Sequence, residues 1–458
     1  MKKNLLNWMT YFMVVIVIVC FVSCGDDNDE INSGTNKITI IGTWYGIEKT
    51  DVVSYQYNAD GTGIFSHGDV MVKFSYSYDA NAKRLTQTVM GESFVYEIIT
   101  LTADLMTGRN VVSGGIRTFT RQEPAPPLFF KDGTLYVNVY EAGVFPDLID
   151  NRKTSTTRMI IKGNLNGTDV ICLREMMISS KGGKLTHLDM SDASIVEGGD
   201  PYDEYYAKSR TRAGWERRIT QNDIISENMF GGCDVIQELV LPNSVVRISH
   251  YMFGGMFSSN ICSITIGQST IGSIDHDDFD VQESLNVLAW MNKLEEINVH
   301  PENPKYTSEN GIMFNKEKTI LYHVPPMYKK ALSLPISLTT IGFHSFLDYS
   351  SSSVKLPNSI KRLEKGAFEL SNIKSIDVGP SVVEIGKHAF ARCDNLESLY
   401  IGSSNPPSVG LDVKSGDDMF YRYRSSPDYR NIKLYVPKGS KGKYASTVPW
   451  SELNIIEI

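Results

Sequence analysis

The sequence predicts a mainly β protein in two parts: a small antiparallel β-barrel or sandwich, then a stack of short repeats that share a parallel β-sheet. The first part is indicated by alternating apolar and polar residues with turn signals between residues 38 and 123. The second is indicated by segments near the C-terminus that align without a gap at a period of 22 residues. A chain of 458 residues exceeds one ordinary domain, which agrees with two packing units.

The chain begins with the layout of a secretory signal. Lys2 and Lys3 form a short cationic start, and an almost unbroken apolar run follows from Met9 to Val22. That run is shorter than the ~20 apolar residues of a membrane-spanning helix, and no basic flank follows it. We therefore expect residues 1–23 to be a cleaved signal peptide, and the alternative is an uncleaved membrane anchor.

Val22, Ser23 and Cys24 resemble a bacterial lipobox, in which small residues precede a cysteine whose thiol receives a diacylglycerol before the leader is cut off. The resemblance implies lipid attachment at Cys24 and an outer-membrane location facing the cell exterior. Residues 24–37 then form an acidic tether with few apolar residues, too polar to fold. Such a tether is similar to the acidic stretch of surface lipoproteins in Bacteroides-like bacteria.

Residues 38–123 predict a small antiparallel β domain. Strand-like runs such as IIGTWYGIE and FVYEIITL alternate with the turn signals NADGTG and DANAK. The segment is short for an eight-stranded calyx of strands near six residues each. Gly42 and Trp44 resemble the opening strand of lipocalin-like domains of bacterial lipoproteins, which implies a possible cup for a small apolar ligand. Aromatic side chains would line that cup: Trp44, Tyr57, Phe65, Phe74 and Tyr76.

Three segments of the second half repeat one pattern. LSLPISLTTIGFHSF, VKLPNSIKRLEKGAF and IDVGPSVVEIGKHAF end at Phe346, Phe368 and Phe390. In each, alternate apolar residues form a short strand, a turn containing Pro or Gly stops it, and an apolar return side ends in the phenylalanine. Because no single coil buries its own apolar face, coils stacked at ~4.8 Å per strand would align the phenylalanines into a spine.

This pattern resembles the leucine-rich repeats of the BspA-like type, found in bacterial surface proteins. The resemblance covers residues 128–458, after a Pro-rich hinge at 124–127. It implies a leucine-rich-repeat solenoid with a parallel β-sheet and a C-terminal cap, and it implies adhesion to host proteins or other cells. Residues 197–222 and 403–431 are longer than a repeat permits, so we expect insertions there.

The sequence indicates no catalytic residue, metal site or cofactor. It contains no G-x-S-x-G, H-E-x-x-H, P-loop or dinucleotide fingerprint. The cysteines beyond the leader and lipobox lack metal-ligand spacing, and small buried core residues are expected for Cys233 and Cys393. Four histidines that precede a repeat phenylalanine are expected to face solvent: His250, His276, His344 and His388. With 45 basic against 53 acidic residues, nucleic acid is not an expected partner.

One side chain of each predicted repeat strand faces out of the sheet. These side chains form a row along the stack, where such scaffolds usually hold a partner. The row comprises Val240, Thr265, Asn298, Ser333, Lys355, Asp377 and Tyr400. We take Lys355, Asp377 and Tyr400 as candidate partner-binding residues, and a merely solvated face is an equal alternative.

The two predicted insertions concentrate Tyr, Trp and Arg, which are enriched at interface anchors. The candidate partner-binding residues of the first are Tyr202, Tyr205, Tyr206, Arg210, Arg212 and Trp215. The segment MFYRYRSSPDYR at 419–430 repeats that chemistry in the second. Alternatively, these aromatic side chains pin long loops onto the coils while the arginines pair with the excess acid.

The sequence therefore predicts a non-catalytic, lipid-anchored protein that recognises a host or bacterial surface protein or glycan. The repeat face and the aromatic loops would make the contacts. Two alternatives stay open: small-ligand binding in the first domain, and a role in assembling the cell envelope.

Overall fold

The protein is described by a computed structural model, which divides into two compact units, Met1–Phe129 and Phe130–Ile458. The structure describes residues 39–48, 51–202, 219–249, 252–253, 260–274, 288, 291–410, 419–420 and 428–458. The predictions for residues 1–37, lipid attachment at Cys24 among them, lie outside the described residues. Within those described ranges, no helix has the length and apolar character needed to cross a membrane.

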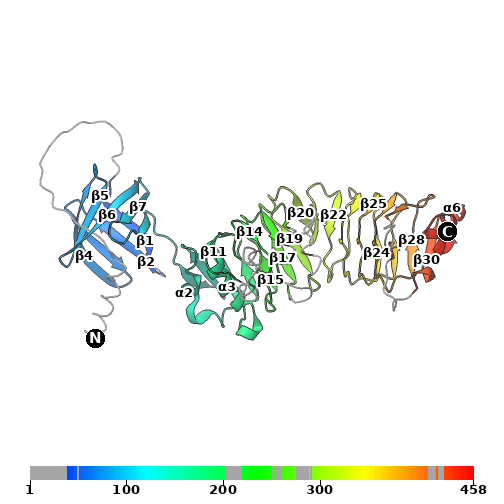
Figure 1. The fold of residues 1–458 in the computed structure, drawn as a ribbon, viewed down its shortest axis with the longest axis horizontal. Helices are drawn as coiled ribbons and strands as arrows, with labels where there is room; N and C mark the ends of the chain where they lie inside the picture. Colours follow the sequence, from blue (N-terminus) through cyan, green and yellow to red (C-terminus); the bar gives the residue numbers. More distant parts are fainter. Residues whose placement is uncertain are drawn as a thin grey trace, which may run out of the picture. The chain divides into compact units, whose positions relative to one another are not determined.

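The first unit contains a closed antiparallel barrel of eight strands (Figure 1). In chain order they are β1 (Gly42–Glu48), β2 (Asp51–Tyr57), β3 (Thr62–His67), β4 (Val70–Asp79), β5 (Arg84–Val89), β6 (Glu92–Leu101), β7 (Leu105–Asn110) and β8 (Ile116–Thr120). The expectation that this segment is short for eight strands is wrong, because the connections are tight. Two residues join β5 to β6, Met90 and Gly91.

Aromatic side chains fill the barrel interior. Trp44 is fully buried, and Tyr57, Phe65, Phe74 and Tyr76 are each at most 7 % exposed. The ring centroids of Tyr57 and Tyr76 lie 5.0 Å apart, and those of Tyr57 and Phe74 lie 5.5 Å apart. The five residues expected to line a cup therefore pack among neighbouring rings, and this packing takes the space that a small ligand would need.

The second unit is built from coils whose strands pair in parallel (Figure 1). The first sheet contains β9 (Leu128–Lys131), β10 (Thr134–Val139), β11 (Arg158–Leu165), β12 (His187–Asp189), β13 (Ala193–Ile195), β15 (Glu238–Val240), β17 (Ser263–Ile266) and β19 (Glu296–Val299). The C-terminal sheet contains β24 (Ser353–Lys355), β26 (Ser375–Asp377), β28 (Ser398–Tyr400), β30 (Lys433–Val436) and β31 (Asn454–Glu457). The mainly β fold with a parallel repeat sheet is confirmed.

The return side of the coils forms two further sheets. One contains β14 (Ile224–Ile225), β16 (Arg247–Ser249) and β18 (Gly272–Ile274). The other contains β20 (Tyr306–Glu309), β21 (Ile312–Asn315), β22 (Ile320–His323), β23 (Thr340–Ile341), β25 (Arg362–Leu363), β27 (Glu384–Ile385) and β29 (Ser408–Val409). Three α-helices are described in this unit: α2 (Phe145–Ile149), α3 (Gly167–Met176) and α6 (Lys441–Ala445).

Phenylalanines from successive coils stack in the core. The rings of Phe346 and Phe368 lie 4.6 Å apart at 11°, and those of Phe368 and Phe390 lie 5.7 Å apart at 20°. All three side chains are fully buried. The amides of Phe346 and Phe368 donate to the carbonyls of Ala367 and Ala389 at 2.8 Å, one coil further on. The predicted register of the phenylalanines is confirmed.

The stack continues through part of the second predicted insertion. The amide of Phe390 donates to the carbonyl of Met419 at 2.8 Å, and the ring of Phe390 lies 5.9 Å from that of Phe420. Ser408 and Val409 form β29, which pairs with β27. The prediction that residues 403–431 are an insertion is therefore wrong in part, because they contain another coil. The pattern was hidden because extra residues separate its strand from its Met-Phe end.

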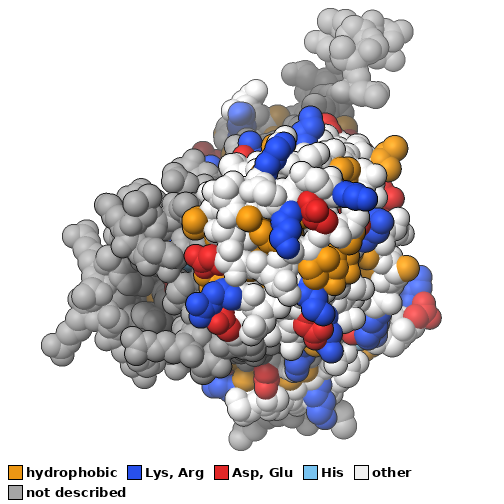
Figure 2. Space-filling model, turned by 90° about the vertical axis from the view of Figure 1, so that its right-hand side faces the viewer, with side chains coloured by type: hydrophobic (Ala, Val, Ile, Leu, Met, Phe, Trp, Pro, Cys, Tyr) orange, Lys and Arg blue, Asp and Glu red, His pale blue; other side chains and the backbone are white. Residues whose placement is uncertain are grey.

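Aromatic side chains of the cap cover the last coil. Tyr444 and Trp450 are fully buried. The Tyr444 hydroxyl donates to the carbonyl of Ser403 at 2.9 Å, and Trp450 Nε1 donates to the carbonyl of Pro407 at 3.1 Å. Figure 2 looks onto the side of the molecule at the right of Figure 1, where charged side chains of both signs lie between small hydrophobic groups. The cap thus ends the apolar core and presents a mixed, largely polar surface.

One expectation about the repeat histidines is wrong. His344 was expected to face solvent, but its side chain is 14 % exposed and its Nε2 lies 3.0 Å from Glu369 Oε2. The next coil covers it so closely that a Cβ at Gly366 would lie 2.1 Å from the imidazole ring. His250 and His276 lie outside the described residues. Cys233 and Cys393 are buried thiols outside any disulfide, so their assignment to the core is confirmed.

The phenylalanine stack predicts a large effect of shortening its central member. Phe368→Ala removes a fully buried ring and leaves a cavity between two coils, so we expect it to lower the free energy of unfolding by about 3 to 5 kcal/mol. Val383→Ala, at a position 64 % exposed in the following coil, should change it by less than ~0.5 kcal/mol. Urea denaturation measures both values. Equal effects of the two substitutions would contradict the packing described.

A buried histidine predicts a pH-dependent stability. His323 is 3 % exposed, and burial lowers its pKa to about 3. Because an unfolded histidine titrates near ~6.5, the unfolded state binds the proton first, and stability falls as the pH drops from about 6.5 toward 3.

Between pH 6.5 and 5 the native protein should lose about 1 to 2 kcal/mol of stability through this group. His323→Gln removes the titration, so its unfolding free energy should fall less over the same pH interval. Urea midpoints at the two pH values check the difference between the two proteins. If the unfolding free energies of the native protein and His323→Gln fall equally over this pH interval, His323 does not titrate as described.

Candidate partner-binding face

The outward side chains of the C-terminal sheet stand in register. Lys355 of β24 lies opposite Asp377 of β26, and Asp377 lies opposite Tyr400 of β28. Tyr400 in turn lies opposite Tyr435 of β30. The residues just before them in each strand are buried: Val354, Ile376, Leu399 and Leu434. Because side chains alternate across a strand, the buried set fixes the outward set, which we call the outward row.

The outward row combines a charged pair with an aromatic pair. Lys355 Nζ lies 3.4 Å from Asp377 Oδ2, and the two side chains are 79 % and 37 % exposed. The Tyr400 and Tyr435 rings are stacked, with centroids 4.3 Å apart at 6°. An exposed ion pair of this kind adds little to stability, about 0 to 1 kcal/mol. Its groups remain available to a partner, beside two tyrosines that lose little entropy on binding.

Sequence reasoning missed Tyr435. The signal for it lies in the sequence, because SLYIG at 398–402 recurs as KLYVP at 433–437. The shared Leu-Tyr places the second tyrosine at the same outward position, and this signal was sufficient to find it. Conversely, Ser333 lies outside every described strand. It is nevertheless exposed between Leu332 and Leu334, which pack against the core, so its outward orientation agrees with the prediction although no strand forms there.

The first sheet carries its own outward residues. Val240 lies opposite Thr265, and Thr265 lies opposite Asn298. These three side chains are small or polar and provide no aromatic anchor. The C-terminal sheet therefore holds the part of the predicted row with hot-spot side chains.

Tyr202 was predicted as a partner contact, and this is wrong. Its side chain is 2 % exposed, and its hydroxyl donates to the carbonyl of Glu227 at 2.9 Å. Arg174 donates to the carbonyl of Tyr202. The aromatic ring thus holds the start of the 197–222 segment against the coils, which was the alternative considered. The other candidates of that segment lie outside the described residues: Tyr205, Tyr206, Arg210, Arg212 and Trp215.

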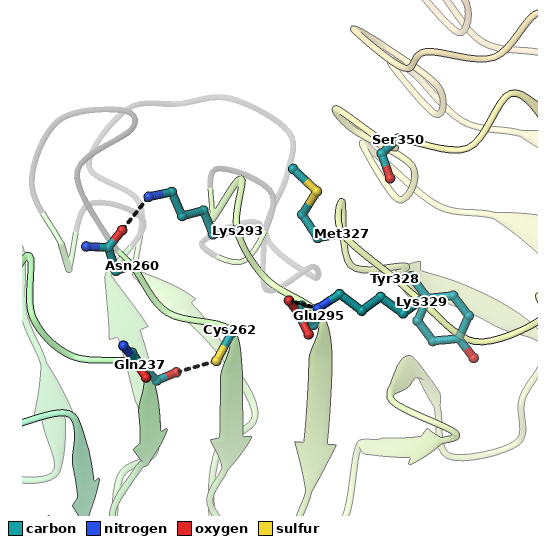
Figure 3. A pocket seen from close by; sticks show the side chains of 9 residues that line it. All are labelled: Gln237, Asn260, Cys262, Lys293, Glu295, Met327, Tyr328, Lys329 and Ser350. Carbon is teal, nitrogen blue, oxygen red and sulfur yellow. Dashed lines mark hydrogen bonds and ion pairs between the residues drawn. The ribbon is translucent and has the colours of Figure 1, made fainter.

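A pocket of about 750 Å³ lies where β15, β17 and β19 begin (Figure 3). It is lined by Gln237, Asn260, Cys262, Lys293, Glu295, Met327, Tyr328, Lys329 and Ser350. Lys293 donates to Asn260 Oδ1, and Lys329 pairs with Glu295. The Cys262 thiol donates to the carbonyl of Gln237 at 3.3 Å. These polar groups are therefore largely engaged with one another.

The chemistry of this pocket does not favour nucleophilic catalysis. Burial, with Glu295 and Glu238 nearby, raises the pKa of the Cys262 thiol. A raised pKa keeps the sulfur protonated, whereas catalytic cysteines act as thiolates. Among the residues that the structure describes, no three His, Cys, Asp or Glu side chains gather as a metal-ligand group.

Comparison with known proteins identifies the repeats. Residues 218–301 and 328–410 match the family described as "BspA type Leucine rich repeat region", in six copies. No curated protein sequence matches the chain.

Several solved structures are similar to this chain at low identity. A leucine rich cell surface protein from Faecalibacterium prausnitzii A2-165 is 15 % identical over 86 % of this chain and 94 % of that chain, with a TM-score of 0.39. A leucine-rich repeat protein from Eubacterium ventriosum ATCC 27560 is 14 % identical over 74 % of this chain and 78 % of that chain, with a TM-score of 0.34. A leucine-rich repeat protein from Bacteroides ovatus ATCC 8483 is 12 % identical over 79 % of this chain and 90 % of that chain, with a TM-score of 0.33.

The matched range 328–410 includes the three predicted members of the outward row. The coils that carry Lys355, Asp377 and Tyr400 therefore lie in a region that matches the BspA-type leucine-rich repeat family.

Proposed function

We propose that this protein is a non-catalytic cell-surface lipoprotein that recognises a host or bacterial surface protein or glycan through its leucine-rich-repeat solenoid. Lipid at Cys24 would hold it in the outer membrane, facing outward. The BspA-type repeats support a role in surface recognition or adhesion. Display of many copies on one membrane would raise the effective affinity for a multivalent partner surface.

The outward row is the observation that carries this proposal. Lys355, Asp377, Tyr400 and Tyr435 occupy successive strands at one register. Successive strands lie ~4.8 Å apart, so the row offers hydrogen-bonding, charged and aromatic groups at regular intervals. An extended polypeptide or glycan chain can contact several of them at once. The buried residues beneath keep these groups in place before the partner arrives, which reduces the entropy lost on binding.

The alternative functions have less support. Small-ligand binding by a lipocalin-like domain needs a cavity, and aromatic rings occupy the barrel interior. A role in envelope assembly would use the same face with a bacterial partner, and the identity of the captured protein distinguishes it from adhesion.

The outward row predicts which side chains contribute to binding. The full chain is applied to an array of host matrix proteins, mucin glycans and purified envelope proteins. Combined Tyr400→Ala and Tyr435→Ala substitutions should weaken binding to the captured partner at least about tenfold, since aromatic anchors commonly contribute more than ~1 kcal/mol.

The return side of the same coils supplies a matched control. Arg362 of β25 and Glu384 of β27 form an exposed ion pair at 2.9 Å, which parallels Lys355 and Asp377 on the other side. Arg362→Ala should change the affinity less than about twofold. If Arg362→Ala weakens binding as much as the tyrosine substitutions, the outward row is not the recognition surface. Capture of an envelope protein alone would support assembly in place of adhesion.

A further inference from the structure

The two ends of the barrel differ in their chemistry. In an up-and-down barrel, the turns after β1, β3, β5 and β7 lie at one end and those after β2, β4 and β6 at the other. The chain enters β1 and leaves β8 at the second end, which we call the connection end. The first end carries neither connection, and we call it the tip.

Polar groups close the connection end. Asp79 Oδ1 accepts hydrogen bonds from the amides of Asn81 and Ala82, both at 2.9 Å. The Arg121 guanidinium lies 3.7 Å from the centroid of the Trp44 ring and donates to the carbonyl of Thr39 at 2.8 Å. The turns at this end are thus satisfied by polar groups, and its exposed apolar side chains, Ile41 at 43 % and Leu105 at 36 %, are fewer and on average less exposed than those of the tip.

The tip displays apolar side chains. Three hairpin turns contribute them, those after β3, β5 and β7. The exposed fractions are 39 % for Val70, 74 % for Met71, 74 % for Met90, 48 % for Val111, 86 % for Val112 and 57 % for Ile116. A single exposed apolar residue needs no explanation, but such residues on three turns at one end of a barrel indicate a contact surface.

The turns hold these side chains outward in defined positions. Met90 and Gly91 have φ values of +51° and +88°, a type I′ turn whose first central position favours Asn or Gly over a long side chain. Asn110 Oδ1 accepts from the amides of Val112 at 2.9 Å and Ser113 at 2.6 Å, which fixes the loop that carries Val112. Both turns keep an exposed apolar side chain at a position where it adds nothing to the packing of the barrel.

We propose that the tip docks onto the lipid bilayer that holds the Cys24 anchor, with the exposed Met, Val and Ile side chains entering the boundary between headgroups and acyl chains. The inference rests on the lipid anchor of the proposed function. The turn residues of the tip include no Tyr, Trp or Arg, the types typical of protein hot spots. Separate apolar turns suit a deformable lipid phase, into which each can insert independently.

Charge and chain length fit the same partner. Along the chain, Lys49, Asp69 and Glu92 fall at the tip turns, so the tip has no excess of basic residues, and apolar area rather than attraction to anionic lipid would drive docking. The roughly 15 residues from Cys24 to Thr39 span at most ~50 Å. The longest strands, β4 and β6, have 10 residues each and extend ~33 Å. A lipid on Cys24 can therefore reach the level of the tip.

Methionine oxidation tests the docking directly. The full chain, carrying its anchor, is reconstituted into vesicles of phosphatidylcholine and phosphatidylethanolamine and treated with hydrogen peroxide. Mass spectrometry follows sulfoxide formation at Met71 and Met90, with Met327 of the repeat region as the internal reference. Met327 is 45 % exposed, less than either tip methionine. With the tip in water, Met71 and Met90 should therefore oxidise faster than Met327. Docking should reverse the order of these rates, so that Met71 and Met90 oxidise at least about tenfold more slowly than Met327.

A polar substitution at the tip should restore the order. Val112→Asp places a carboxylate at an 86 % exposed position, so the barrel should fold while the tip no longer enters the bilayer, and Met71 and Met90 should again oxidise faster than Met327. Ile336→Asp is the matched control, because Ile336 is 89 % exposed in the repeat region. It should leave the slow oxidation of Met71 and Met90 unchanged.

Three results would overturn the inference, and they differ from one another. Met71 and Met90 oxidising faster than Met327 in a lipidated chain rejects docking alone. Protection that disappears when the protein is diluted into tenfold more lipid assigns the tip to a second copy of the chain. An N-terminal peptide whose mass lacks diacylglycerol on Cys24 rejects the anchor, and the docking inference fails with it.

Discussion

A coil of the repeat region cannot bury its own apolar side chains, and the rest of the second unit depends on this constraint. From β12 onward the strands have only two to four residues each, so the apolar face of a coil is covered only when another coil lies on it. The ladder hydrogen bonds, the stacked rings of Phe346, Phe368 and Phe390, and the buried aromatic side chains of the cap all meet this requirement. Stability therefore comes from contacts between neighbouring coils.

The same constraint determines the candidate binding face. Once Ile376 and Leu399 are buried, Asp377 and Tyr400 have to point outward at a fixed spacing. Recognition then needs no separate scaffold, because the register that buries the core also aligns the outward row. The barrel buries its apolar side chains without stacked coils, because its strands form a closed sheet with aromatic rings inside. Its exposed tip is free to serve another contact.

The sequence predicts the periodic part of this fold well and the irregular parts poorly. The 22-residue period places Phe346, Phe368 and Phe390 correctly because each coil faces the same environment as its neighbours. Ser333 faces outward between Leu332 and Leu334 as predicted, although no strand forms there. Tyr202 was misjudged because composition identifies a side chain suited to contact, while only the folded chain shows that it packs on its own protein.

Two other differences between prediction and structure arise from spatial neighbours that the linear sequence pattern does not reveal. His344 is covered by the coil that contains Gly366, and that coverage depends on how closely two backbones approach. The eight strands of the barrel fit because hairpins such as the one at Met90 and Gly91 need only two residues. The tip residues carry no sequence motif, and their common location emerges only from the order of the strands around the barrel.

A double-mutant cycle between Phe346 and Phe368 tests the central claim, that neighbouring coils stabilise one another through stacked rings. The free energy of unfolding is measured for the native protein, each single alanine variant and the double variant. The account predicts a coupling of about 1 kcal/mol between these two positions, and additivity within ~0.5 kcal/mol for Phe346 paired with the distant Phe230. Additive effects for Phe346 and Phe368 as well would contradict it.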